Sequence, residues 1–142
     1  MIPQDPTMFT GTLRFNLDPE EKVDDTTMLD LMTRAGLTNL LDQGGLDQQI
    51  TEGGTNMSSG EKQLICICRA IVRKSKVVIL DEATSNIDVV TEQKIQQIIS
   101  ENFRDSTMLT IAHRLNTIIT SDKVLVLSFG RIKEYDSPGA LM

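Results

Sequence analysis

Apolar residues recur at three- and four-residue steps in three stretches of the chain, which is the spacing of one buried helix face. The first stretch has Asp25 or Thr26 as a possible N-cap and Gly36 as a C-cap. The third covers about residues 90–103. The apolar positions are Met28, Leu31, Met32 and Ala35, then Leu64, Ile65, Cys68, Ile71 and Val72, and finally Ile95, Ile98, Ile99 and Phe103. The pattern therefore predicts three amphipathic helices.

Elsewhere the apolar residues are consecutive, which is typical of strands buried on both faces in a parallel sheet. Val77–Leu80 is such a run and ends in acidic residues. Thr107–Ala112 is expected to be a second buried strand and Lys123–Leu127 a third, and a Phe-Gly turn leads into a fourth, Arg131–Tyr135. Strands that alternate with helices predict an α/β fold with a mainly parallel sheet core.

Turn-forming residues dominate the stretch Pro3–Pro19, which we interpret as an ordered loop. Within it, Thr12–Phe15 is expected to form a short strand or one turn of helix. Short helices are expected at Leu37–Leu41 and Leu115–Ile119, and a polar loop at residues 50–60. The polar loop ends in a Ser-x-x-Glu capping box, which predicts the start of a helix.

Composition narrows the class of protein. The 142 residues match one domain, and 39% hydrophobic with 24% charged residues is a globular composition. The net charge of −6 argues against a nucleic-acid surface, which needs clustered Lys and Arg. No apolar run approaches the roughly 18 residues of a membrane helix, and no secretory signal is visible at the first residues. Cys66 and Cys68 are expected to be reduced thiols packed in a core, which fits the cytosolic compartment.

Two adjacent carboxylates, Asp81 and Glu82, follow the run Val77–Leu80. In α/β folds ligands bind at the carboxyl ends of strands. Asp81 could hold Mg²⁺, directly or through water, and Glu82 could act as a general base on an attacking water. The alternative is a plain strand end with a solvated turn.

Three other residues carry weaker signals. Ser58 lies at a predicted helix N-terminus, where it could help to bind an anion or could simply cap the helix. His113, the one histidine, follows a predicted strand and could contact a phosphate or serve structure alone. Gln4 could ligate Mg²⁺ and orient a water through its amide, or could be an ordinary turn residue.

The order of these signals resembles the ATP-binding-cassette (ABC) ATPases. The matching motifs are the Q-loop (Gln4), the signature loop (Met57–Gln63), the Walker B strand (Val77–Glu82), the D-loop (Ser85–Asp88) and the H-loop (His113). The surrounding sequence is similar to subfamily C, the multidrug-resistance-associated exporters. It matches at Ile2–Pro6, Phe9–Arg14, Asn16–Pro19, Glu52–Gly54, Leu80–Ser85, Ile111–Leu115 and Tyr135–Pro138. The resemblance covers essentially the whole chain and implies a partial ABC ATPase fold with a helical signature subdomain.

The resemblance implies ATP and Mg²⁺ as cofactors and a role for each matching residue. Asp81 and Gln4 would be Mg²⁺ ligands, Glu82 the general base, His113 a γ-phosphate and water contact, Ser58 and Gly60 contacts to the ATP of the opposite domain, and Asp88 a residue of the dimer seam. Gln4 would also sense Mg²⁺ and water for the membrane domain. A Glu at position 82 is similar to the hydrolytically competent second nucleotide-binding domain of such exporters.

Two departures from the family pattern matter. The usual signature Leu-Ser-Gly-Gly-Gln is here Met57-Ser58-Ser59-Gly60-Glu61, which keeps the Ser and the second Gly. The phosphate loop, Gly-x-x-x-x-Gly-Lys-Ser/Thr (Walker A), occurs nowhere in the 142 residues. The chain is therefore expected to be the C-terminal portion of such a domain and, taken alone, to bind MgATP poorly and to hydrolyse none.

The expected organisation is one partial nucleotide-binding domain. Residues 1–19 would form the Q-loop region, 20–75 the helical signature subdomain, and 76–142 the Walker B, D-loop and H-loop regions with the C-terminal strands. The parent would be an ABC exporter that couples ATP hydrolysis to efflux of organic anions, conjugates or drugs. Its partners would be a second nucleotide-binding domain, in a head-to-tail sandwich, and the transmembrane domains, with this domain on the cytoplasmic side of the membrane.

Two alternatives belong to other classes. A truncated, non-catalytic fragment could bind a complete cassette through its signature face and complete that partner's ATP site. A cassette ATPase of the DNA-repair or translation-factor kind would not be a transporter. The net charge and the context Asn16–Pro19 argue against the second alternative.

Overall fold

The computed structural model of the chain describes residues 1–82, 87–112 and 115–141. The chain divides into two compact units, residues 1–110 and 111–142. The first unit carries most of the core and nearly all of the described candidate residues, and each unit is considered by itself.

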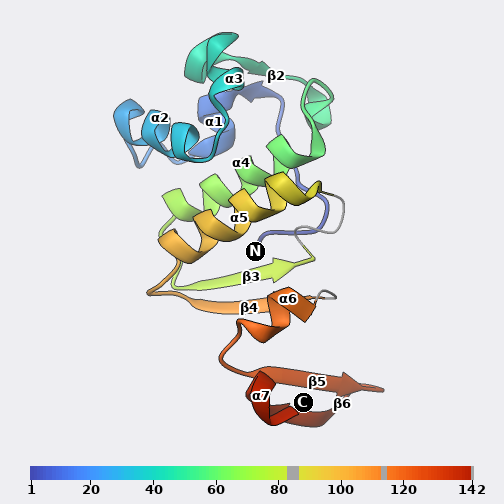
Figure 1. Cartoon of the computed structure of the whole chain (residues 1–142). Helices are drawn as coiled ribbons and strands as arrows, with labels where there is room; N and C mark the ends of the chain where they lie inside the picture. Colours follow the sequence, from blue (N-terminus) through green and yellow to red (C-terminus); the bar gives the residue numbers. More distant parts are fainter. Residues whose placement is uncertain (83–86, 113–114, 142) are drawn as a thin grey trace. The chain divides into compact units, whose positions relative to one another are not determined.

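The sheet of the first unit is built on β3 (Val77–Asp81) and β4 (Thr107–Ile111), which run in the same direction (Figure 1). The chain crosses between them through α5 (Val89–Asn102), which is the parallel β-α-β connection that the alternating pattern predicted. The N-terminal residues add to the same sheet, since Ile2 forms a parallel bridge with Leu80 of β3. An α/β fold is thereby confirmed.

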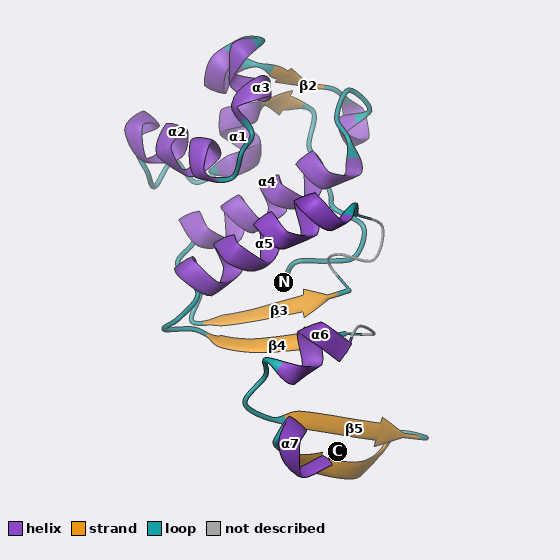
Figure 2. Ribbon diagram, in the orientation of Figure 1, coloured by secondary structure: helices purple, strands orange, loops and turns teal. Residues whose placement is uncertain are grey.

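Two long helices, α4 (Ser59–Val72) and α5, pack against each other and cover one face of this sheet (Figure 2). The predicted apolar faces of both helices are buried, with Ile71 of α4 only partly so. They meet Val78 and Leu80 from β3 in a single core. Burial of these aliphatic side chains is the main driving force for this layer, because the chain has no Trp and few aromatic residues.

Shorter elements form the rest of the first unit. They are β1 (Gly11–Thr12), α1 (Leu13–Leu17), α2 (Asp25–Arg34), α3 (Thr38–Asp42), the 3₁₀ turns at 45–47 and 52–54, and β2 (Gln49–Ile50). β1 and β2 pair antiparallel. The expected N-cap of α2 was wrong by one or two residues, because Asp24 caps this helix by accepting a hydrogen bond from the Thr27 N–H at 2.7 Å.

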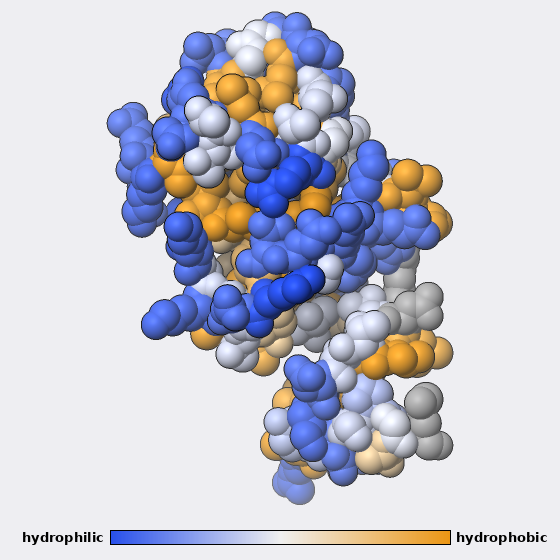
Figure 3. Space-filling model, turned by 60° about the vertical axis from the view of Figure 1, so that its left-hand side comes forward, coloured by the Kyte–Doolittle hydropathy of each residue, from blue (hydrophilic) through white to orange (hydrophobic). Residues whose placement is uncertain are grey.

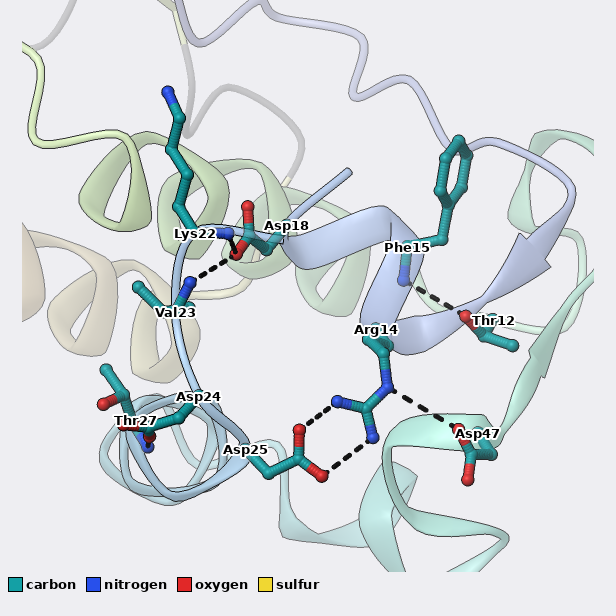
Figure 4. A network of polar contacts seen from close by, with 10 residues as sticks. All are labelled: Thr12, Arg14, Phe15, Asp18, Lys22, Val23, Asp24, Asp25, Thr27 and Asp47. Carbon is teal, nitrogen blue, oxygen red and sulfur yellow. Dashed lines mark hydrogen bonds and ion pairs between the residues drawn. The ribbon is translucent and has the colours of Figure 1, made fainter. Parts of the chain in front are cut away.

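A polar network ties α1 to its neighbours (Figure 4). Arg14 makes a two-pronged ion pair with Asp25, and its Nε lies 3.7 Å from Asp47. The buried Asp18 carboxylate accepts hydrogen bonds from the backbone N–H groups of Lys22 and Val23 at 2.5 and 2.8 Å. The Asn-Leu-Asp-Pro context therefore has a structural role, since it fixes the course of the chain between α1 and α2.

The expectation of strands buried on both faces was wrong for β3 and β4. Val78 and Leu80 are buried, but Val77 is 55% exposed, and Leu109 and Ile111 in β4 are 54% and 53% exposed. Helices α4 and α5 cover one face of these strands, so alternate side chains on the other face remain accessible among the described residues. A run of apolar residues does not by itself show whether one or both faces of a strand are buried.

The second unit contains α6 (Leu115–Ile119), β5 (Val124–Ser128), β6 (Arg131–Asp136) and α7 (Pro138–Leu141). β5 and β6 form the predicted antiparallel hairpin. Phe129 and Gly130, with φ of 49° and 73°, make the turn, because a two-residue hairpin turn of this hand needs left-handed backbone at both positions.

Hydrophilic side chains cover much of the face in view in Figure 3, with separate apolar patches between them. Within the described part of the chain, no helix combines the length and the apolar character required to cross a bilayer.

Candidate functional site

The candidate catalytic carboxylates lie where β3 ends. Asp81 is the last residue of the strand and is half-buried. Glu82 follows with φ of 44°, in the left-handed region that a non-glycine residue seldom adopts. Strained backbone of this kind persists only where the surrounding structure holds it, and it is common at functional sites. The strain was not predictable from residue type, because Glu carries no preference for this conformation.

The N-terminal segment brings Gln4 toward these carboxylates. The Ile2 N–H donates to the Ile79 carbonyl at 2.7 Å, and the Asp81 N–H donates to the Ile2 carbonyl at 3.0 Å. Residues 2–4 therefore run beside the carboxyl end of β3, and Gln4 lies two residues beyond the bridge. Carboxylate and amide oxygens are hard ligands of the type Mg²⁺ accepts, usually together with several waters. The donor set of Asp81 and Gln4 fits such an ion, although no three His, Cys, Asp or Glu side chains converge anywhere in the described residues.

Gln63, the last residue of the signature loop, has a structural role that the sequence reasoning did not assign. Its side chain is 1% exposed, and its Nε2 donates to the Pro3 carbonyl at 3.2 Å. The signal was present, since a glutamine at a core position of an amphipathic helix must have a hydrogen-bond partner. Through this bond α4 holds the backbone immediately before Gln4.

Ser58 begins α4 with the predicted capping box, which is confirmed in both directions. The Ser58 Oγ accepts from the Glu61 N–H at 3.2 Å, and the Glu61 carboxylate accepts from the Ser58 N–H and Oγ–H at 2.8 Å each. Asn39 donates to the other Glu61 oxygen at 2.6 Å. Partial burial raises the pKa of Glu61, but these hydrogen bonds outweigh it, and the net pKa is lowered. Glu61 is therefore an ionised part of the cap, and Ser58 remains exposed beside it.

Asp88 caps the next helix. Its carboxylate accepts from the N–H groups of Val90 and Thr91 at 3.1 and 3.0 Å. Hydrogen bonds from the Thr91 side chain and then from its N–H lower the pKa of Asp88. Thr91 also lies against Gly60, because a Cβ added to Gly60 would be 3.1 Å from the Thr91 Cγ2. The first turn of α4 and the first turn of α5, which follows the D-loop, are thus in contact within this chain.

Arg69 joins α4 to the segment after Gln4. Arg69 donates through Nε to the Asn16 carbonyl at 2.7 Å and through both Nη atoms to the Thr7 carbonyl at 3.3 Å. Its guanidinium lies 5.3 Å from the Phe9 ring centre, and Phe9 meets Phe15 edge to face at 6.3 Å. Phe9 and Phe15 are 48% and 46% exposed, so they form an aromatic pair at the surface.

The candidate residues therefore fall into two groups at one end of the first unit. The N-termini of α4 and α5 and the carboxyl end of β3 lie on the same side (Figure 1). One group contains Gln4, Asp81 and Glu82, and the other contains Ser58, Gly60 and Asp88. His113, and the D-loop residues Ser85 and Asn86, lie outside the described residues.

Cys66 and Cys68 are free and buried, as predicted. Burial raises the pKa of both thiols, that of Cys68 to about 12. Deprotonated, nucleophilic thiolate is therefore scarce at neutral pH, which argues against a catalytic role for either residue.

Comparison with known proteins gives consistent results. The model of the ABC transporter family matches residues 1–85. ATP-binding cassette sub-family C member 4 of Homo sapiens is 47% identical over 100% of this chain and 11% of its own length. ATP-binding cassette sub-family C member 8 of Cricetus cricetus is 48% identical, again over the whole chain and 9% of its own length. The probable multidrug resistance-associated protein lethal(2)03659 of Drosophila melanogaster is 46% identical over the whole chain and 10% of its length. The chain thus spans about a tenth of the curated relatives it matches.

Proposed function

The chain belongs to the ABC transporter family, and we propose that it forms part of the ATP-hydrolysing domain of a subfamily C exporter. The exporter would couple ATP hydrolysis to efflux of organic anions, conjugates or drugs across a membrane, with this domain on the cytoplasmic side. The observation that carries the proposal is the clustering of both candidate groups at one end of the sheet and its covering helices, where α/β proteins bind ligands.

In this proposal Asp81 and Gln4 hold Mg²⁺ through their side-chain oxygens. The ion, when bound, neutralises the charge that develops on the transferred phosphate oxygens. Glu82 orients the attacking water and takes its proton, at a position that the left-handed backbone turns out of the line of β3. His113 contributes a contact to the γ-phosphate.

Ser58 and Gly60 act on the ATP held by an opposite nucleotide-binding domain. The proposal is supported by the exposure of Ser58 and by its place at the N-terminus of α4. The free N–H groups and the helix dipole favour an anion at that end. The Ser58 hydroxyl has one proton, which it now donates to Glu61. To donate to a phosphate oxygen, the hydroxyl would turn away from Glu61, while still accepting from the Glu61 N–H.

The exposed Phe9–Phe15 pair is proposed to face the transmembrane domains. Aromatic side chains are enriched at interfaces, and the Arg69 guanidinium holds Phe9 in position through a cation–π contact. Since α4 also holds Pro3 through Gln63, a shift of the signature helix would move the segment that carries Gln4 and Phe9 together.

The decisive experiment mixes this chain with an intact cassette domain and measures ATP turnover by the latter. We expect the wild-type chain to raise turnover, and Ser58→Arg or Gly60→Asp to abolish the rise. Ser100→Arg, which adds the same charge at an exposed serine late in α5, should leave the rise intact. Equal stimulation by wild type and by both signature variants would refute the proposal.

A second candidate function is that of a non-catalytic subunit which acts only by completing a partner's site. Its support is the exposed Ser58 at the N-terminus of α4, where a partner's nucleotide could be met. Isothermal titration of the chain with MgATP tests the non-catalytic role directly. We expect no micromolar binding and no turnover by the chain alone; turnover would exclude the non-catalytic role.

A further inference from the structure

We propose that Thr91 is a positioning residue that locks the signature turn to the D-loop end of α5, and that Gly60 is a glycine because of Thr91. The inference rests on the proposed function of the signature turn and deepens it. It attributes the fixed relative positions of Ser58, Gly60 and Asp88 to the contact between Gly60 and Thr91.

The first step is that glycine is not required by the backbone at position 60. Gly60 is the second residue of α4, and its φ lies outside the left-handed region. An alanine would favour the helix there, because glycine is among the poorest helix formers. Some contact must therefore account for the absence of a side chain.

The second step is that Thr91 supplies this contact. A Cβ on Gly60 would lie 3.1 Å from the Thr91 Cγ2, closer than ordinary van der Waals distance, and 3.8 Å from the Thr91 Cβ and Oγ1. Only the methyl group of Thr91 is too close. Thr91 cannot easily retreat, because its N–H donates to the Asp88 carboxylate at 3.0 Å and its backbone is part of the first turn of α5.

Thr91 thus has two partners. Its methyl group packs on Gly60 of the signature turn, and its backbone N–H donates to Asp88 at the end of the D-loop. A β-branched residue suits this task, since its restricted χ1 angle limits the positions that the methyl group can take. The result is a face on which Ser58, Gly60 and Asp88 keep fixed mutual positions.

The test is a double-mutant cycle of Gly60→Ala and Thr91→Ser in the full 142-residue chain. Serine keeps the hydroxyl and removes the methyl group. We expect Gly60→Ala to lower the midpoint of thermal unfolding by about 2–5 °C and Thr91→Ser in the same chain to restore at least half of that loss. Additive effects of the two substitutions would overturn the proposal.

The same four chains are then mixed with an intact cassette domain. We expect Gly60→Ala to reduce the rise in partner turnover at least tenfold and the double variant to recover at least half of the wild-type rise. If the double variant regains stability but not stimulation, close approach of the nucleotide explains Gly60, and the proposal is overturned. If the wild-type chain itself gives no rise, the proposed function fails, and the thermal cycle alone still decides whether Thr91 excludes a side chain at position 60.

Discussion

Glu82 combines a strained backbone with a candidate catalytic carboxylate. A left-handed conformation costs a non-glycine residue about 1–2 kcal/mol, and the chain bears this cost at Glu82, the residue that follows β3. A residue selected only for stability at this position would be glycine. The presence of glutamate is therefore physical support for a role of its carboxylate.

Replacing Glu82 by glycine should stabilise the chain. We expect the free energy of unfolding to rise by about 0.5–1 kcal/mol, because relief of strain outweighs the larger loss of backbone entropy. Chemical denaturation measures the change, and Glu82→Gln, which keeps the strain and removes the charge, is the matched control. A destabilising Glu82→Gly would show that the carboxylate contributes more to the fold than the strain costs.

The buried thiols give a second prediction for single residues. Burial raises the pKa of Cys66 and Cys68, so both thiols are protonated and covered at pH 8. We expect iodoacetamide to alkylate them at least about 100-fold more slowly in the native chain than in urea, as thiolate is the reactive form. Mass spectrometry of the labelled chain measures both rates. Complete labelling within minutes under native conditions would contradict the burial.

At the scale of elements, local sequence signals placed most helices and strands. The capping box at Ser58 and Glu61 and the Phe129-Gly130 turn were predictable, because each is a short-range hydrogen-bond or backbone requirement. The contact of Gly60 with Thr91 and the bond from Gln63 to Pro3 were not, because they join residues far apart in sequence. The number of covered faces of β4 also depends on tertiary packing alone.

The cap of α4 can be separated from the proposed phosphate contact. We expect Ser58→Ala to lower the free energy of unfolding by about 1 kcal/mol, since it removes the acceptor for the Glu61 N–H. Ser58→Asn, with an equally good N-cap, should stay within about 0.5 kcal/mol of wild type. Urea denaturation followed by circular dichroism compares the three chains. Equal stability of all three would mean that the capping box contributes little to α4.

At the scale of the whole molecule, carboxylates with lowered pKa are spread over both units. They include Glu61 and Asp88 at the candidate site, Asp24 and Asp25 at α2, and Asp136 in β6. A carboxylate whose pKa is lower in the folded than in the unfolded chain stabilises the fold above its unfolded pKa. That stabilisation is lost as the pH falls through the folded value.

We therefore expect the midpoint of thermal unfolding to be nearly constant between pH 6 and 8 and to fall below about pH 4.5, the upper ordinary value for these groups. Calorimetry over this range measures the change. Added salt should reduce the part that comes from exposed ion pairs such as Arg14–Asp25 and Lys123–Asp136. A midpoint that rises as the pH is lowered from 6 to 3 would contradict the assignment.

Arg69 binds the segment after Gln4 through carbonyl oxygens of Thr7 and Asn16, and main-chain carbonyls are the same whatever side chain a residue carries. The arginine thus recognises the path of the loop rather than its composition. Loops of different sequence but equal length could be exchanged at residues 7–10 without loss of this anchor. Arg69→Lys, by contrast, would lose it, because one ammonium group cannot span both carbonyls as the planar guanidinium does. The surface that residues 7–10 present can accordingly change in side-chain composition while α4 and its anchor stay the same.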